Sequence, residues 1–301
     1  MPVSIYEAVW IFLIYAFLGW CTEVAYAALE TKNFINRGFL NGPVCPVYGF
    51  GVLVVILALT PLKKNFLLLF AGSFMMTSMI EFITGFLLEK LFHNQWWDYS
   101  EENFNLCGYV CLKFSILWGL GCTLVIDVVH PAIYKMIVVT PKLPGAVVLT
   151  VLCVIFAVDT AITVASILSL NKRIELLNEI AVKLKSVSNE IGGNIYEGIT
   201  IAVEKGGEWK ENADVRAAEI SEKRESFKEN MKSAVSEERT KLLEEYHRLM
   251  KRSSFGSKRL MKAFPRMKST LYQETFQKWK SQNSNNSKDA KCHEQESKKV
   301  Q

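Results

Sequence analysis

Long apolar stretches without a single charged side chain dominate the first 170 residues of this chain. A helix needs about 20 consecutive, mainly apolar residues to cross the hydrocarbon core of a bilayer. Several stretches reach or approach that length with only modest extension. They include Ala8–Thr22, Gly38–Leu62, Asn65–Ile80 and Leu143–Val158. A soluble globular domain is therefore excluded for residues 1–170.

The charged residues are divided unequally along the chain. Residues 1–170 hold only 8 of the 35 Lys and Arg residues and 10 of the 30 Asp and Glu residues, so residues 171–301 hold 27 and 20. This division predicts an all-α polytopic membrane helix bundle over residues 1–170. A cytoplasmic amphipathic helical region is expected over residues 171–280, and a disordered polar tail over residues 281–301, which has almost nothing to bury.

We expect five membrane-spanning segments, at about residues 5–29, 44–62, 65–90, 109–130 and 146–170. Pro131–Pro144 is expected to form the loop between the last two. An odd number of spans places the termini on opposite faces. Lys172–Arg173 directly after the fifth span, and the absence of basic residues before Lys32, favour an outside N-terminus and a cytoplasmic C-terminus, although the basic residues of the short loops slightly oppose this orientation.

The region after the last span carries two apolar stripes. Apolar residues recur at steps of four and three from Ile174 to Ile191, which is typical of one face of a helix. We expect Gly192–Gly193 to end that helix. A second stripe over residues 208–252 is imperfect, and it indicates a docking or pairing helix rather than a long autonomous coiled coil.

Ionisable side chains inside the predicted spans are the most informative candidate site residues. Each costs about 3 kcal/mol at the bilayer centre on insertion scales, so each needs a partner or a water-filled cavity. Three of them are expected at one depth, beside charged residues of the first and third loops, and another belongs to a polar stripe in the fifth span. Two interpretations remain open: a static network that holds helices together, or a substrate or proton path. The ionisable residues within the spans are Glu23, Glu81, Lys113, Asp127 and Asp159. The candidate residues of the path or network are Glu23, Glu81, Lys113 and Asp159, together with the loop residues Arg37 and Asp98.

The first loop and the start of the second span are unusually rich in glycine and proline. The stretch over residues 36–51 reads NRGFLNGPVCPVYGFG. Exposed backbone groups at a membrane edge are tolerated only where protein or a water-filled cavity covers them. The stretch therefore indicates either a broken or re-entrant helix at the entry of a site, or a tight turn followed by small residues that let helices approach closely. Its candidate site residues are Asn36, Gly38, Gly42, Pro43, Tyr48 and Gly49.

The third loop begins with the sequence HNQWWDYS and concentrates aromatic side chains. Trp97 and Tyr99, with their tryptophan neighbour, are typical of the aromatic belt at a membrane surface. The alternative is a lid or partner-docking surface in which Asp98 pairs with Arg37 or Lys113.

Signatures of enzymes and of metal or nucleotide sites are missing from the sequence. There is no GxxxxGK[ST] phosphate loop, so the chain is not expected to hydrolyse ATP itself, and HExxH and GxSxG are absent too. The seven cysteines include no CxxC pair and the four histidines lack ligand spacing, so we expect neither a metal nor a cofactor. No enzymatic activity is expected; an acid/base pair of Glu23 and Glu81 would require both carboxyl groups in one cavity.

Nucleic acid is not an expected partner either. The 27 basic residues after residue 170 are interspersed with 20 acidic ones, and no nucleic-acid-binding motif is present. We expect these basic residues to attract anionic lipid head groups instead.

Four blocks of sequence carry a resemblance to a known family. They are FLGWCTEV (17–24), NRGFLNGPVCPVYGFG (36–51), WWDYSEENFNLCGYVCLKFSILWG (96–119) and KRLMKAFPRMKSTLYQETF (258–276). In these blocks the chain resembles bacterial integral membrane proteins described as ABC-transporter permeases. The resemblance implies a multi-pass protein of the bacterial cell membrane that moves a small or amphiphilic solute, powered by a separate ATPase subunit. Position by position, it picks out Glu23, Asn36, Arg37, Gly38, Gly42, Pro43, Tyr48, Gly49, Trp97, Asp98, Tyr99, Asn105, Lys113 and Trp118.

Two functions of different classes follow. The first is a permease-like membrane subunit of a small-solute transport system, with Glu23, Glu81 and Lys113 along the path and Arg37 and Asp98 at its mouth. A separate ATPase would dock on its cytoplasmic loops or basic tail. The second is a membrane-anchored structural or regulatory protein whose cytoplasmic helical tail binds a partner or a lipid surface. The lipid bilayer is a partner in both, and both leave a homo-oligomer open.

Overall fold

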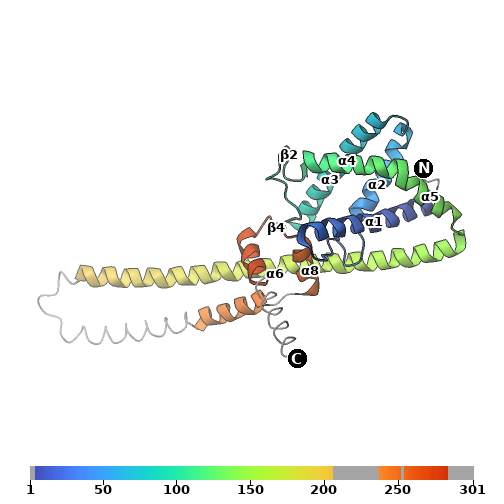
Figure 1. Ribbon diagram of the computed structural model, residues 1–301. Helices are drawn as coiled ribbons and strands as arrows, with labels where there is room; N and C mark the ends of the chain where they lie inside the picture. The colour runs from blue at the N-terminus through green and yellow to red at the C-terminus, as the bar shows by residue number, and fades with distance from the viewer. Residues whose placement is uncertain (1–3, 206–236, 252–253, 284–301) are drawn as a thin grey trace, which may run out of the picture. The chain divides into compact units, whose positions relative to one another are not determined.

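A computed structural model describes residues 4–205, 237–251 and 254–283 of the chain, and almost all of the described structure is helical (Figure 1). The chain divides into two compact units. The first consists of Met1–Asn171 and Ser254–Gln277, and the second of Lys172–Ser253 and Lys278–Gln301.

The first unit contains the membrane helices and four short strands. Its helices are α1 (Ile5–Thr31), α2 (Pro46–Leu59), the 3-10 helix η1 (Thr60–Leu62), α3 (Phe66–Phe92), α4 (Leu112–Leu124), the π-helix η2 (Val125–Val129), α5 (His130–Val139), the first part of α6 (Lys142–Lys205), and α8 (Phe255–Ala263). Its strands are β1 (Asn94–Gln95), β2 (Asn105–Leu106), β3 (Val110–Cys111) and β4 (Lys268–Ser269).

The ends of the long helices follow from local sequence. The Ser4 hydroxyl accepts a hydrogen bond from the backbone N–H of Glu7 at the start of α1, and the Asn65 side chain does the same for α3. At their C-termini, Lys32 and His93 adopt left-handed backbone conformations, with φ of 55° and 53°. These caps satisfy backbone groups that the first and last turns of a helix leave without partners.

Four helices are long and apolar enough to span a membrane, counting only the described part of the chain: Ile5–Thr31, Phe66–Phe92, Leu112–Val139 and Lys142–Asn189. The predicted second span corresponds to a shorter apolar helix, Pro46–Leu62. That helix is close to the lower length limit of about 17 residues for crossing a bilayer. The predicted class, an all-α polytopic membrane bundle of about five spans, is therefore confirmed.

The fourth span is longer than its sequence suggested. We expected a loop from Pro131 to Pro144, whereas α5 continues the helical path to Val139. Proline lacks a backbone N–H and its ring clashes with the carbonyl four residues earlier. The π-helix η2 ends just before Pro131, which lies in the first turn of α5. A π-bulge changes the hydrogen-bond pattern locally, so the chain accommodates proline without leaving the helix.

Helices α1 and α2 pack closely through small residues. A Cβ atom added at Gly49 would lie 2.5 Å from the carbonyl oxygen of Phe12, so only glycine permits this approach. Beside this contact lies a buried aliphatic and aromatic cluster shared by α1, α2 and α5. Its members are Ile11, Tyr15, Ile56, Ile133 and Ile137.

Helices α3 and α4 meet through small and partly polar side chains. The Ser78 hydroxyl donates a hydrogen bond of 2.8 Å to that of Ser115. Gly119 lies against Phe74, whose backbone would be 3.2 Å from an added Cβ atom. A second buried cluster joins α2, α3 and η2 and consists of Val55, Leu59, Leu69 and Ile126.

The strands form two antiparallel pairs at the ends of the membrane helices. In the first, β2 pairs with β3 within the third loop. In the second, β1 at the start of that loop pairs with β4, with Asn94 opposite Ser269. The segment 254–277 thus belongs to the first unit. This grouping differs from the expected division of the chain, which placed it in one cytoplasmic region over residues 171–280.

The second unit has its own buried side chains. They include Ile174 and Leu177 on α6, Met250 on the helix 237–251, and Trp279 on the helix 273–283. The Asn283 side chain donates hydrogen bonds to the carbonyl oxygens of Met250, at 3.1 Å, and Trp279, at 2.9 Å. The first apolar stripe predicted after the last span is therefore partly buried.

Two boundaries predicted in the second unit are wrong. Gly192–Gly193 does not end α6, which continues to Lys205, because each glycine disfavours a helix by only about 1 kcal/mol and does not break it as proline does. The helix 273–283 also extends past residue 281, where the disordered tail was expected to begin. The rest of that tail, residues 284–301, and most of the second stripe, over residues 206–236, lie outside the described residues.

Candidate functional site

The first and third loops lie against each other at one end of the first unit. The ring of Phe39 in the first loop lies 5.1 Å from that of Trp96 and 6.3 Å from that of Phe92 at the end of α3. Both α1 and α3 therefore end at this face. Glu23 lies in the last third of α1 and Glu81 in the second half of α3, so both carboxylates lie toward the loops.

Glu23 is held by a hydroxyl and a guanidinium. The Tyr48 hydroxyl, from the first turn of α2, donates a hydrogen bond of 2.5 Å to Glu23 Oε1. Arg37 Nε in the first loop lies 3.3 Å from Glu23 Oε2. The same guanidinium is 3.7 Å from Glu30 and lies over the ring of Tyr26 at 5.3 Å. Arg37 is thus fixed between two turns of α1, with Glu23 as its nearer carboxylate.

Glu81 has a weaker set of partners. The Tyr99 hydroxyl from the third loop donates to Glu81 Oε1 at 3.3 Å. The other oxygen, Oε2, is buried and has no hydrogen-bond partner among the described residues. Tyr99 stacks on Phe114 at 4.9 Å. Burial, and then the charges of Glu81 and Glu23, raise the pKa of Tyr99, so its hydroxyl stays protonated and available as a donor.

These side chains form one electrostatic group, which we call the carboxylate cluster and define as Glu23, Arg37, Tyr48, Glu81 and Tyr99. The charges of both Glu81 and Glu23 act on the Tyr99 hydroxyl, which connects the two carboxylates electrostatically. The cluster contains two carboxylates but only one guanidinium. A group of this composition has acceptor oxygens that can bind a proton or a cation.

Loop one is organised around Asn36. Its side-chain oxygen accepts hydrogen bonds from Trp20 Nε1, at 2.8 Å, and from the backbone N–H of Gly38, at 3.0 Å. Its amide nitrogen donates to the carbonyl of Asn41 at 2.9 Å. Asn36 therefore closes the loop on itself and attaches it to α1. Pro43, later in the same loop, is exposed.

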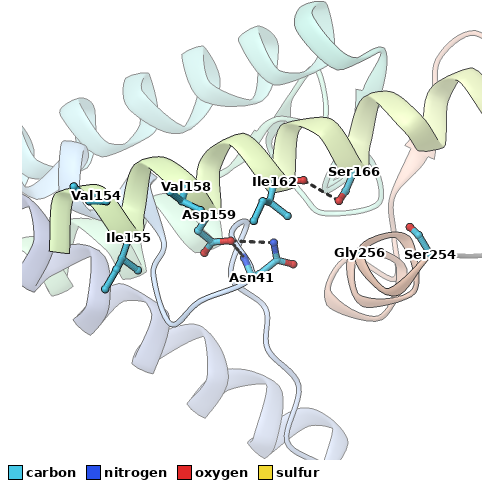
Figure 2. A pocket seen from close by; sticks show the side chains of 9 residues that line it. All are labelled: Asn41, Val154, Ile155, Val158, Asp159, Ile162, Ser166, Ser254 and Gly256. Carbon is cyan, nitrogen blue, oxygen red and sulfur yellow. Dashed lines mark hydrogen bonds between the residues drawn. The ribbon is translucent and has the colours of Figure 1, made fainter. Parts of the chain in front are cut away.

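Asp159, in the fifth span, has a separate role at the same end of the molecule. Its Oδ1 accepts hydrogen bonds from the backbone N–H of Asn41, at 3.0 Å, and from the Asn41 side chain, at 2.9 Å. Its Oδ2 accepts from the backbone N–H of Gly42 at 2.7 Å. Asp159 thus accepts hydrogen bonds from loop one and is not a member of the carboxylate cluster. Figure 2 shows the Asn41 side chain turned toward this carboxylate.

A groove of about 640 Å³ lies on α6 around Asp159 (Figure 2). One part of its wall is aliphatic, and these side chains are roughly half exposed, as expected for the lipid-facing side of a spanning helix. The polar groups gather toward loop one and the start of α8. The lining residues are Asn41, Val154, Ile155, Val158, Asp159, Ile162, Ser166, Ser254 and Gly256.

The third loop does not pair its charges as we predicted. Asp98 bonds to Lys268 at 2.5 Å and also accepts from Ser100, rather than pairing with Arg37 or Lys113. Burial alone would raise the pKa of Asp98, but the hydrogen bonds from Lys268 and Ser100 outweigh it and lower the pKa to about 2. The carboxylate is therefore fully ionised at neutral pH.

Lys113 lies outside the carboxylate cluster. Its ammonium is 3.8 Å from Glu102, and 69% of its side chain is exposed. Two other residues of the third loop have structural contacts: Trp97 Nε1 donates to the carbonyl of Tyr109 at 2.9 Å, and Asn105 bonds to backbone carbonyls within the loop. The prediction that Lys113 shares one site with the two glutamates is not what the structure shows.

The aromatic side chains of the third loop are not all anchors at a membrane surface. Trp96 is only 3% exposed and packs edge-on against Phe39, Phe92 and Phe264. The Tyr99 ring stacks within the protein and its hydroxyl reaches Glu81. Trp96 and Tyr99 therefore pack within the protein rather than serving only as anchors at a membrane surface.

Three residues that contact this region were not singled out from the sequence. Asn41 and Arg259 bind Asp159 and loop one respectively, and Lys268 binds Asp98. The only signal for the last two was their place in the block 258–276 that resembles the family. In the described part of the chain, no group of three or more His, Cys, Asp or Glu side chains could hold a metal ion.

The comparisons with known proteins concern the membrane half of the chain. A family model described as "Putative ABC-transporter type IV" matches residues 10–164. The matched range covers Glu23, Arg37, Tyr48, Glu81 and Tyr99, the whole carboxylate cluster. No solved structure matches the chain.

Proposed function

This chain belongs to the family described as ABC-transporter type IV, and on that premise we propose that it is the permease-like subunit of a small-solute transport system powered by a separate ATPase. The family and the apolar helices already fit a membrane transport component. We further propose which residues line the solute path, which surface binds the ATPase and which face of the membrane unit is cytoplasmic.

The carboxylate cluster is the observation that supports the proposed path. Ionisable groups within membrane helices are costly and typically face a bundle interior or a wet cavity. Here Glu23 on α1 pairs with the Arg37 guanidinium, whereas Glu81 on α3 has no basic partner in the described structure and its Oε2 is buried without a hydrogen-bond partner there. A purely structural network would be expected to satisfy such an oxygen. The excess of carboxylate over guanidinium favours a cationic solute, or one that moves together with a proton.

The energy source is proposed to be a second protein. The chain contains no phosphate loop, so ATP hydrolysis would take place on a partner subunit. We place its docking surface on the face formed by the first and third loops. The same face carries the segment 254–277, whose five basic residues exceed its one acidic residue. By the positive-inside rule, this face is proposed to be cytoplasmic, with the N-terminus outside. The chain itself is proposed to have no enzymatic activity.

Purification of the full-length protein in mild detergent tests the partnership. We expect a subunit with a phosphate loop to copurify, and the purified complex to hydrolyse ATP. A chain that purifies without any ATPase, from cells that also express the adjacent reading frames, would contradict the proposal.

A matched pair of substitutions tests the path itself. Glu81→Gln removes the charge of one carboxylate of the cluster. Glu89→Gln makes the same change at a second glutamate of α3, whose carboxylate also accepts a hydrogen bond from a tyrosine, Tyr109, at 2.6 Å. In proteoliposomes containing the complex and a pH-sensitive dye, ATP-dependent proton or cation movement should disappear with Glu81→Gln and persist with Glu89→Gln. Equal loss in both variants would point to a structural role for these carboxylates.

A regulatory anchor is the second candidate function. The second unit has buried residues of its own, including Trp279 and Leu177, and could present a surface to a partner or a lipid. This function predicts the opposite outcome for the matched pair: Glu81→Gln would leave the cellular activity intact, and substitutions confined to exposed residues of the second unit would abolish it.

A further inference from the structure

The segment Ser254–Gln277, which we call the clasp, returns to the membrane unit after about 80 intervening residues and contacts both the first and the third loop. Its apolar side is buried: Leu260, Ala263 and Met267 are at most 1% exposed. The clasp is therefore part of the fold at this face rather than a loose tail.

The first attachment of the clasp is to loop one. The guanidinium of Arg259, on α8, donates from Nη1 to the carbonyl oxygen of Gly38 and from Nη2 to that of Phe39, both at 2.8 Å. A planar guanidinium presents its donors in a fixed fork, so it holds two consecutive carbonyl groups in one orientation. Arg259 thereby fixes the backbone directly after Arg37.

The second attachment is to loop three. Strand β4 pairs with β1, and the backbone N–H and the hydroxyl of Thr270 both donate to the carbonyl of His93, at 3.0 and 2.9 Å. Phe264 packs edge-on against Trp96 at 5.1 Å. Lys268 bonds to Asp98 at 2.5 Å. The clasp thereby holds the backbone at the start of loop three and the side chain of Asp98, the residue directly before Tyr99.

Each attachment is thus one residue away from a partner of an intramembrane carboxylate. Arg259 holds Gly38, next to the Arg37 that binds Glu23. Lys268 holds Asp98, next to the Tyr99 that binds Glu81. The two contacts come from residues nine positions apart in one short segment, so movement of the clasp would displace both partners together.

We propose that the clasp controls access to the carboxylate cluster, with Arg259 and Lys268 as positioning residues for Arg37 and Tyr99. When the clasp is docked, Arg37 and Tyr99 each contact one oxygen of a carboxylate, Glu23 Oε2 and Glu81 Oε1 respectively. When it is released, both carboxylates become available to a proton or a cationic solute. This inference rests on the proposed function in one respect, namely that the cluster lies on the solute path.

The position of the clasp in the chain suits it to regulation. The residues that precede it and those that follow it belong to the second unit. A partner that binds the second unit is therefore connected to the clasp through the backbone at both ends. Such a partner can shift the clasp only if it binds the released and docked states with different affinity.

Chemical labelling of the two carboxylates tests the clasp without any measurement of transport. The full-length protein in nanodiscs is treated with a carbodiimide and an amine, and labelling at Glu23 and Glu81 is measured by mass spectrometry. We expect Arg259→Gln and Lys268→Glu each to raise labelling at both glutamates several-fold. Lys262→Gln is the matched control, because Lys262 is an exposed basic residue of the same helix, and it should leave labelling unchanged.

A charge exchange distinguishes positioning from a general loss of structure. The double variant Asp98→Lys with Lys268→Glu restores the ion pair in reverse and should return labelling to the level of the unmodified protein. If Arg259→Gln does not fold, two milder variants replace it. Arg259→Lys keeps the positive charge, and Lys268→Gln changes a side chain that is 46% exposed.

The outcomes separate this inference from the proposed function. Two results would contradict the proposal that the clasp controls access to the carboxylate cluster. The first is unchanged labelling in the folded Arg259 and Lys268 variants, and the second is an increase in labelling that the charge exchange does not reverse. A different result is an increase in labelling that the charge exchange reverses, in a protein that moves no solute and binds no ATPase. That result would support control of access by the clasp and contradict the transport function.

Discussion

Asp159 and Glu81 are both carboxylates within apolar helices at the same end of the protein, yet their surroundings differ. Asp159 accepts three hydrogen bonds from loop one, from two backbone N–H groups and one amide. Glu81 accepts one long hydrogen bond from Tyr99 and leaves its second oxygen buried without a partner in the described structure. An intramembrane carboxylate is therefore not by itself a functional residue, because the hydrogen-bond donors around it decide its role.

The largest effect expected from this comparison is on stability at Asp159. Asp159→Asn replaces one acceptor oxygen with an NH₂ group, which would face a donor from Asn41 or Gly42. Loss of charge-assisted hydrogen bonds and a buried donor without a partner should lower the free energy of unfolding by about 3 kcal/mol. Thermal unfolding in detergent measures it.

Glu81→Gln is the matched comparison for this prediction. Its single hydrogen bond is long, so the change in the free energy of unfolding should stay below about 1 kcal/mol. If Glu81→Gln destabilises the protein as much as Asp159→Asn does, the distinction between a structural and a functional carboxylate is wrong.

The second prediction compares the two tyrosine donors of the carboxylate cluster. Tyr48→Phe removes the donor that lies 2.5 Å from Glu23, and Tyr99→Phe removes the one that lies 3.3 Å from Glu81. The shorter bond should contribute more, so Tyr48→Phe should cost about 2 kcal/mol and Tyr99→Phe about 0.5 kcal/mol. Denaturant unfolding of both variants in one detergent gives the ratio. The reverse order would show that Glu81, rather than Glu23, is the more firmly held carboxylate.

How far the sequence predicts this structure depends on the distance between interacting residues along the chain. The spans follow from the local apolar runs, because a bilayer requires about 20 apolar residues wherever a helix crosses it. The shared level of Glu23 and Glu81 follows from the direction in which alternate spans run. Both features are read from short windows of sequence.

The contacts that organise the loops could not be predicted in this way. Asn41 and Asp159 are 118 residues apart, Asp98 and Lys268 are 170 residues apart, and Arg259 lies 221 residues from Gly38. Neither periodicity nor charge pattern indicates which residues such long connections bring together. Asp98 was therefore assigned to nearby basic residues, and its partner proved to be a lysine that follows a separate unit in the chain.

The third prediction concerns space around Asp159. A Cβ atom added at Gly42 would lie 3.1 Å from Asp159 Oδ2, whereas one added at Gly121 would meet nothing within 4 Å. Gly42→Ala should therefore lower the free energy of unfolding by about 1 kcal/mol, because the carboxylate must shift away from the Gly42 N–H. Gly121→Ala should be neutral or slightly stabilising, since alanine favours a helix. A stable Gly42→Ala protein would mean that loop one yields easily and that Asp159 does not hold it firmly.

The smallest expected effect is the pH dependence of the Asp98–Lys268 pair, which contrasts a carboxylate at the protein surface with the two inside the membrane. The pKa of Asp98 is lowered from 3.8 to about 2, so the folded protein binds a proton at Asp98 less readily than the unfolded chain does. The stabilisation is therefore complete above pH 3.8 and is lost as the pH falls through about 2. Because Lys268 is 46% exposed, the pair should contribute only about 0.5 kcal/mol. The difference in unfolding free energy between the unmodified protein and Asp98→Asn should stay constant from neutral pH down to pH 3.8 and shrink below it. A difference that already falls near neutral pH would show that a group other than Asp98 controls the attachment of the clasp to loop three.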